Sequence, residues 1–243
     1  MQRFEESNAA FRTTRPTLLD GLHTGDDAAR RGALDQLIRI YWPPVYAYLR
    51  RSGRGRDESA ELTQAFFADV ALRRDLFGRA AAERGKMRTL IIGALKHYLI
   101  DVLRRQRARG GPALPIADLE REERVVPDAA TVPPDEAFDR RWALVVLEEA
   151  MARCREHFHA TGKVGHWSVF EARVLAPSIS NITPPPLAQL SASHGFRTPA
   201  DAAAAVQVVK KRAAALLREV AGESACGPQD QDDEHRLVVA MLS

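Results

Sequence analysis

The fold of this chain is decided by the stretch Asp57-Glu58-Ser59-Ala60-Glu61-Leu62-Thr63-Gln64-Ala65-Phe66-Phe67 and by the segment Thr89–Arg109 that follows it. Apolar residues in the later segment recur at helical spacing, so one face of that helix packs inward. The residues on this face are Leu95, Leu99, Val102 and Leu103. The same spacing predicts a helix for the earlier stretch, and its buried residues are Leu62, Phe66, Val70 and Leu72.

Asp57 and Phe67, at the two ends of the earlier helix, have separate predicted roles. Asp57 is expected to be its N-cap, because carboxylates favour the positive end of a helix. Phe67 lies one position away from the predicted buried face. It is either an ordinary core residue or an exposed aromatic available to a partner, since single exposed apolar residues are common on proteins.

The helix within Thr89–Arg109 carries a dense set of cations on its other face and at its end. These cations are Lys96, Arg104, Arg105, Arg107 and Arg109, against the single acid Asp101. Cations in a last turn complement the helix dipole, which accounts for Arg104 and Arg105. The later arginines run past the last apolar residue, so the pattern also indicates a surface for phosphates.

Composition narrows the class of protein. The chain has 243 residues, 45% of them hydrophobic, and a net charge of +3, which is ordinary for a globular protein of one or two domains. Two cysteines give no disulfide framework, and no apolar run is long enough to cross a membrane. No signal-peptide core follows Met1. We therefore expect a cytoplasmic protein without a membrane partner.

The region before Asp57 predicts two helical segments. Leu34, Leu37, Ile38 and Tyr41 form a helical stripe, and Pro43-Pro44 is expected to interrupt it before a second segment at Val45–Arg51. Residues 52–56 are expected to form a loop.

A proline-containing and acidic linker is expected over residues 110–134. Eight acids lie between Asp118 and Asp139, where only two arginines oppose them. This segment is either a solvated spacer or a mimic of nucleic-acid charge. Asp135 then opens a long helix that contains Trp142.

The second half of the chain predicts further helices. One includes Trp167, Phe170 and Val174 and is expected to stop at Pro177. A short helix over Leu187–Gly195 closes with its glycine. The next begins with Thr198 as N-cap, Pro199 in the first turn and Asp201 completing a capping box. An apolar stripe follows at Val206, Val209, Ala213, Leu216, Leu217 and Val220.

A short helix, a glycine turn and a long capped helix together predict a helix-turn-helix. Base-reading side chains usually lie near the start of the second helix, but here Ala202–Ala205 cannot donate or accept hydrogen bonds at base edges. Gln207 is the best candidate for a base contact, and lysines supply phosphate affinity with little sequence information. The candidate DNA-binding residues of this motif are Thr198, Asp201, Gln207, Lys210, Lys211 and Arg212.

Several strings along the chain resemble one family, the bacterial RNA polymerase sigma factors of the extracytoplasmic-function type, and in particular its planctomycete-type subgroup. The acidic helix Asp57–Phe67 is followed by a basic loop and by an apolar helix that ends in arginines, and this order of elements is similar to that of the family. The longer strings are Phe11-Arg12-Thr13-Thr14-Arg15, Tyr41-Trp42-Pro43-Pro44-Val45-Tyr46-Ala47-Tyr48-Leu49-Arg50 and Phe138-Asp139-Arg140-Arg141-Trp142-Ala143-Leu144. One departure is Pro16, where the subgroup has tryptophan.

The resemblance implies an all-α protein of two small helical domains. It implies an N-terminal extension (1–32), a domain that binds polymerase and the promoter −10 element (33–109), the linker (110–134), a helix-turn-helix domain for the −35 element (135–222) and a C-terminal tail (223–243). The tail is either a short docking helix or an ordinary terminus. The implied partners are core RNA polymerase, promoter DNA and a regulator such as an anti-sigma protein or a kinase.

The resemblance also assigns residues. Those implied to bind polymerase are Glu61, Leu62, Gln64, Phe66 and Phe67. Those implied to bind the −10 element are Arg73, Arg74, Lys86, Arg88, Lys96, His97, Arg104, Arg105 and Arg107. On residue types alone, the arginine-rich span 73–88 is interpreted as a solvated loop rather than a base-binding pocket. The resemblance reverses that preference, because the family places its base-capturing loop there.

No catalytic constellation, and therefore no enzyme, is predicted. The sequence has no glycine-rich phosphate loop and no Ser/His/Asp order. Cys154, His157 and His159 lack a fourth metal ligand, so they are interpreted as a helix end, and neither a metal nor a cofactor is expected. Two other functions stay open: a helix-turn-helix regulator that works as a dimer without polymerase, and a sigma-like interaction protein with weak −35 recognition.

Overall fold

The structure, a computed structural model, describes residues 18–23, 26–73, 75–78, 87–108, 132–223, 225 and 228–242. Within these ranges every regular element is a helix and no strand occurs, so the predicted all-α class is confirmed. The chain divides into two compact units, one of Met1–Phe138 with Glu223–Asp230 and the other of Asp139–Gly222 with Gln231–Ser243. None of the described helices has the length and apolar character of a membrane span.

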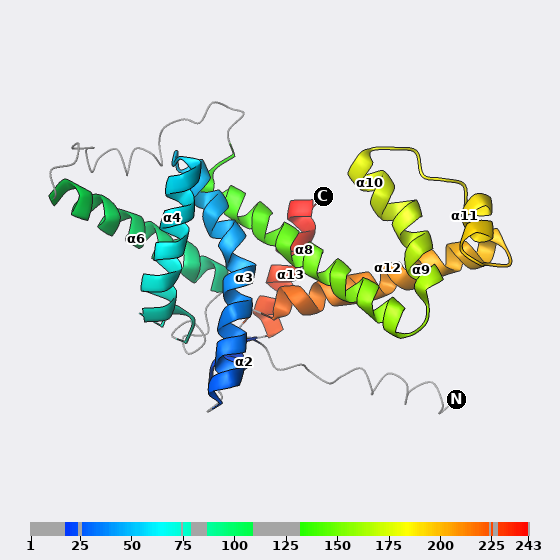
Figure 1. Ribbon diagram of the computed structural model, residues 1–243, viewed down its shortest axis with the longest axis horizontal. Coiled ribbons are helices and arrows are strands. Elements are labelled where there is room, and N and C mark those ends of the chain that lie inside the picture. Colours follow the sequence, from blue (N-terminus) through cyan, green and yellow to red (C-terminus); the bar gives the residue numbers. More distant parts are fainter. Residues whose placement is uncertain are drawn as a thin grey trace. The chain divides into compact units, whose positions relative to one another are not determined.

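The first unit is built around two long helices and a shorter one (Figure 1). Its elements are α2 (Leu18–His23), α3 (Asp27–Arg51), α4 (Arg56–Phe66), the π-helix η1 (Phe67–Arg73) and α6 (Met87–Ala108). Its most deeply buried large side chains are Leu37, Tyr41, Val45, Leu49, Phe66, Phe77, Met87, Ile91, Leu95 and Phe138. On α6 the predicted face is largely confirmed, because Leu95, Leu99 and Leu103 are buried, while Val102 is half-buried.

The expected interruption at Pro43-Pro44 is wrong. Helix α3 runs without a break from Asp27 to Arg51 and contains both prolines. A proline inside a helix removes a backbone hydrogen bond and crowds the preceding turn. Here Tyr41 and Val45, on either side of the prolines, are at most 1% exposed. Burial of the same stripe before and after the prolines holds both halves in one helix.

The expected N-cap at Asp57 is also wrong. Helix α4 begins at Arg56, with Gly55 as its N-cap and no side-chain cap. Asp57 and Glu58 lie in its first turn, where their charges still favour the helix dipole. The difference of one residue places the carboxylate inside the helix rather than before it.

Two successive phenylalanines are buried where α4 passes into the π-helix η1. Phe66 is fully buried and Phe67 is 3% exposed, although neighbours in an α-helix point about 100° apart. A π-helix takes in one extra residue per turn and so changes the direction in which the later side chains point. Val70, within η1, is buried as well.

The second unit contains most of the remaining helices. The elements after residue 131 are α8 (Pro134–Ala160), α9 (Val164–Phe170), η2 (Glu171–Leu175), α10 (Ala176–Ser180), α11 (Leu187–Ser193), α12 (Pro199–Gly222) and α13 (Pro228–Leu242). Trp142, Ala150, Cys154 and Val169 are fully buried in it. The division between the units falls after Phe138, so the first residues of α8 belong to the first unit.

The expected stop at Pro177 is wrong. The helical path continues through η2 into α10, which ends at Ser180. Pro177 is buried in the first turn of α10, directly after the π-helix η2. Asn181, with a left-handed φ of 50°, ends the path instead.

The turn between α11 and α12 has the predicted local chemistry. Gly195 takes φ 75°, and the N–H of Phe196 donates to the carbonyl of Ser191 at 2.9 Å, as glycine-closed helices do. The N–H of Asp201 donates to Thr198 Oγ1 at 3.1 Å, and the N–H of Thr198 donates to Asp201 Oδ2 at 3.1 Å. The capping box is thereby confirmed.

The apolar stripe of α12 is confirmed as well. Val206, Val209, Ala213, Leu216 and Val220 are buried, and Leu217 is half-buried. Within the C-terminal tail, α13 is helical and its Val238 is fully buried.

Candidate nucleic-acid interface

The five residues that the resemblance assigns to polymerase binding differ in their exposure to solvent. Glu61 and Gln64 are exposed and lie three positions apart, so they share the outer face of the helix. Leu62 is half-buried. Phe66 and Phe67 are buried, so only the polar members of the set offer atoms to a partner.

The two buried rings belong to an aromatic cluster in the core of the first unit. The ring of Phe67 stacks on Trp42 with centroids 5.5 Å apart and meets the edge of Phe66 at 5.4 Å. Phe66 in turn meets Tyr98 of α6 at 5.7 Å. This cluster fixes α3, α4 and α6 against one another, which is the core role that the sequence left open for Phe67.

The end of α6 presents exposed guanidinium groups. Arg104 is 68% exposed, and its Nη1 lies 3.8 Å from Asp101 Oδ1. Arg105 is also exposed, its Nε donates to the carbonyl of Asp101 at 3.2 Å, and its guanidinium carbon lies 6.0 Å from the ring centroid of Tyr98. Because both charged ends face solvent, they can contact phosphates.

The other assigned residues of α6 are placed differently. His97 is exposed, while Arg88 and Arg107 are half-buried. One terminal nitrogen of Arg107 is buried and has no acceptor among the described residues. Lys96 Nζ pairs with Asp135 Oδ2 at 2.9 Å. Lys96, which the resemblance assigned to a phosphate, therefore binds a carboxylate of the chain itself. The two residues are 39 positions apart, so no sequence pattern predicted this pair.

Part of the predicted base pocket lies outside the described residues. The backbone of Arg73 ends η1, whereas its side chain, together with Arg74 and Lys86, is outside the described part of the chain. Asp75 takes a left-handed φ of 49°, and the neighbouring Phe77 is fully buried. Phe77 is therefore a core residue.

Helix α12 offers a mixed face. Gln207, Lys210 and Lys211 are exposed and point away from the core of the second unit. Of the four early alanines, Ala202 and Ala205 are buried, and only Ala204 is exposed. Two positions that the sequence placed on the reading surface are thus packing residues.

Thr198 and Asp201, at the N-terminus of α12, form hydrogen bonds with each other. Thr198 is exposed and Asp201 half-exposed, but each side chain accepts a hydrogen bond from the other's backbone. Arg212 is half-buried, and its Nε is buried without an acceptor among the described residues. Gln207, Lys210 and Lys211 are consequently the most accessible polar groups of the predicted set.

Cys154 and His157 lie close to Arg212, inside the second unit. Burial raises the pKa of the Cys154 thiol, and the nearby Arg212 opposes that rise only in part. Burial, followed by the positive charges of Arg212 and Lys163, lowers the pKa of His157. In the described part of the chain, no three His, Cys, Asp or Glu side chains gather closely enough to hold a metal ion.

The described surfaces define a small helical protein with exposed cations on two separate helices, α6 and α12. Comparisons with protein-family models, with curated proteins and with solved structures each found no match to this chain.

Proposed function

We propose that this chain is a sigma factor of the extracytoplasmic-function type. It binds core RNA polymerase in the cytoplasm, opens the promoter −10 region and contacts the −35 region to begin transcription. In this proposal residues 33–109 and 135–222 are separate domains joined by the acidic linker, and an anti-sigma protein or a kinase restrains the factor. No step requires an active site.

The observation that supports this proposal most is the composition of the outer surface of the first unit. Helix α4 exposes Glu61 and Gln64, two of the residues that resemble the family's polymerase-binding helix. Helix α6, in the same unit, exposes Arg104 and Arg105 at its end. One small unit therefore offers one polar surface for a protein and one cationic surface for DNA.

The second unit supports a DNA-binding helix-turn-helix formed by α11, the Gly195 turn and α12. Its long helix exposes one amide, Gln207, and two ammonium groups, Lys210 and Lys211. Phosphate contacts add affinity but little discrimination, whereas a bidentate base contact contributes roughly 1–3 kcal/mol. We infer that this helix strengthens binding to any promoter and reads at most one base pair.

The test is binding of purified core polymerase. We expect the Glu61→Ala, Gln64→Ala double variant to lose co-elution with core enzyme in gel filtration and to lose run-off transcription. Both side chains are exposed, so the fold should persist. The matched control replaces the same residue types at exposed positions of the second unit, Glu156→Ala with Gln189→Ala. Equal polymerase affinity for the wild type and both double variants would contradict the role of α4.

One observation favours a sigma-like interaction protein with weak −35 recognition as an alternative. Thr198 and Asp201 cap each other, and Ala204 is the exposed residue of the alanine run, so the start of α12 offers few base-reading groups. Run-off transcription separates this alternative from the proposal, because such a protein binds core polymerase without initiating. A polymerase-independent regulator would instead elute as a free homodimer.

A further inference from the structure

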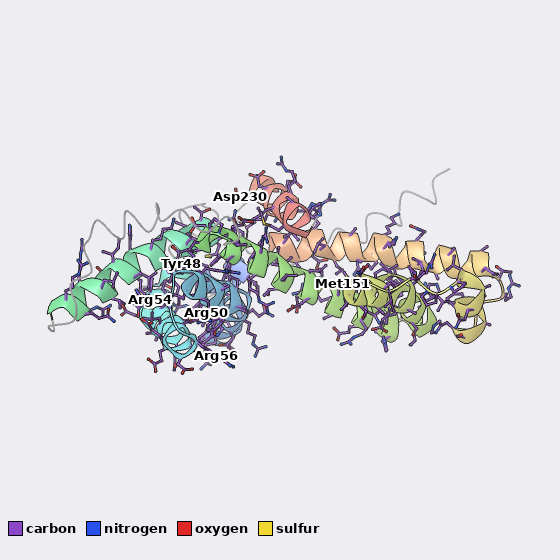
Figure 2. All side chains as sticks on the ribbon, turned by 90° about the horizontal axis from the view of Figure 1, so that it is seen from above. Tyr48, Arg50, Arg54, Arg56, Met151 and Asp230 are labelled. Atoms are coloured by element: carbon purple, nitrogen blue, oxygen red, sulfur yellow. The ribbon has the colours of Figure 1, made fainter. Side chains whose placement is uncertain are left out.

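The turn between α3 and α4 carries a cluster of arginines that neither the −10 nor the −35 set includes. Four arginines fall within seven residues, and we call them the arginine turn: Arg50, Arg51, Arg54 and Arg56. Figure 2 shows Arg50, Arg54 and Arg56 close together where the two helices meet. The only acids beside them in the sequence are Asp57 and Glu58.

The backbone of the arginine turn is fixed by hydrogen bonds. Gly53 takes φ 80°, a left-handed conformation that suits glycine. The N–H of Ser52 donates to the carbonyl of Tyr48 at 2.9 Å, and the N–H of Arg54 donates to that of Leu49 at 3.3 Å. Arg50 Nη1 then donates to the carbonyl of Arg54 at 2.8 Å. The backbone of the turn is therefore held in one shape, which fixes the points from which Arg51 and Arg56 extend and reduces the backbone entropy lost when a ligand binds.

The charges of the turn are only partly balanced. Arg54 Nη1 pairs with Glu58 Oε1 at 2.6 Å, and this pair accounts for one arginine and one acid. Arg50 lies in the last turn of α3, where a cation complements the helix dipole. Arg51 and Arg56 are exposed, and neither forms an ion pair with a described residue. Two guanidinium groups thus remain available to an anion.

The chemistry of the surface favours a nucleic-acid backbone over a protein. Protein interfaces centre on apolar and aromatic side chains, and no exposed large hydrophobic residue among the described ones lies in this turn. A side chain added at Gly53 or at Gly55 would meet open space, so a ligand backbone can approach both glycines closely. Alternating arginine and glycine is also typical of segments that bind single strands without sequence preference.

We propose that the arginine turn is an additional, sequence-independent binding surface for the phosphates of single-stranded nucleic acid, in which Arg51 and Arg56 make the contacts. Each guanidinium binds one phosphate, and the fixed turn sets their spacing. This surface goes beyond the proposed function, because it needs neither polymerase nor a promoter sequence.

The experiment measures binding of a fluorescein-labelled single-stranded oligonucleotide of mixed sequence to the full chain, by anisotropy over a range of salt concentrations. The test variant is Arg51→Gln with Arg56→Gln. The control variant is Arg31→Gln with Arg39→Gln, two exposed arginines elsewhere on α3 that carry the same total charge. Circular dichroism checks that all variants remain folded.

Release of two phosphate contacts should lower the slope of log affinity against log salt by about 1.4, because each contact on a single strand contributes about 0.7. The control should leave the slope unchanged, and Arg51→Lys with Arg56→Lys should retain most of it. Equal slopes for the test and control variants would overturn the proposal. So would a test variant that keeps wild-type affinity for the oligonucleotide but loses core polymerase, because the surface would then bind protein.

Discussion

Alanine substitutions of Phe67 and Gln64 distinguish a residue that stabilises the fold from one that is available to a partner. The ring of Phe67 is 3% exposed, stacks on Trp42 at 5.5 Å and meets the edge of Phe66 at 5.4 Å. Gln64, three positions earlier, is exposed. Phe67→Ala should therefore destabilise the fold, while Gln64→Ala should leave it intact.

The expected magnitude depends on the contacts that are lost. Truncation of a buried phenylalanine to alanine typically costs about 3–5 kcal/mol, which includes the cavity that remains. Each aromatic pair contributes about 0.5–1.5 kcal/mol beyond the area it buries, and Phe67 takes part in two. We expect a loss of about 4 kcal/mol for Phe67→Ala. An exposed substitution such as Gln64→Ala should stay within about 0.5 kcal/mol.

The assay is urea denaturation followed by far-ultraviolet circular dichroism for the wild type and both single variants. With a slope of about 1–3 kcal/mol per molar urea, the Phe67→Ala midpoint should fall by more than about 1 M. A loss below about 1 kcal/mol would refute the burial of this ring. In that case the side chain would be available to a partner, as the resemblance implied.

Three other predictions concern α6 and α12. Arg104→Glu with Arg105→Glu should abolish open-complex formation by core polymerase and the chain, since both exposed charges reverse; an unchanged permanganate footprint would exclude the role of α6. Lys210→Ala with Lys211→Ala should weaken binding to all promoter duplexes alike and lower the salt slope by about two. A loss confined to certain −35 sequences in a promoter scan would show that these lysines read bases. Thr198→Ala should remove half of the capping box and reduce the free energy of unfolding by about 1 kcal/mol. Thr198→Ser should retain that stability in the same urea titration, and equal losses for both variants would point away from the hydroxyl.

The sequence predicted the local features of α12 well because their causes lie within a few residues. The capping box needs only Thr198 and Asp201, three positions apart, and both hydrogen bonds are present. The apolar stripe from Val206 to Val220 likewise results from helical periodicity alone. Features of this kind depend on residue type and spacing, which a sequence states directly.

The continuity of α3 could not be predicted in this way. Local preference places a boundary at Pro43-Pro44, whereas the burial of Tyr41 and Val45 in the unit's core keeps one helix. Pro177 shows the reverse case, because its position in a first turn removes the expected penalty. Contacts in the core, distant in the sequence, therefore decide the case of α3, whereas the position of Pro177 within its own helix decides the other.

The candidate site shows the same division. The helical periodicity of α6 predicts that Arg104 and Arg105 are exposed, because they lie outside its apolar face. It does not predict the ion pair of Lys96 with Asp135, since the two residues come from separate helices. No periodicity connects such residues, so the sequence could assign Lys96 only to a phosphate.

The π-helix η1 has a consequence for the length of this segment. The extra residue in one turn sets the direction of the side chains that follow Phe67, among them the buried Val70. Deletion of one residue within Phe67–Arg73 would convert the turn to an ordinary α-helix and rotate the C-terminal end of the segment by about 100°. A homologue shorter by one residue here would have to repack or replace Val70.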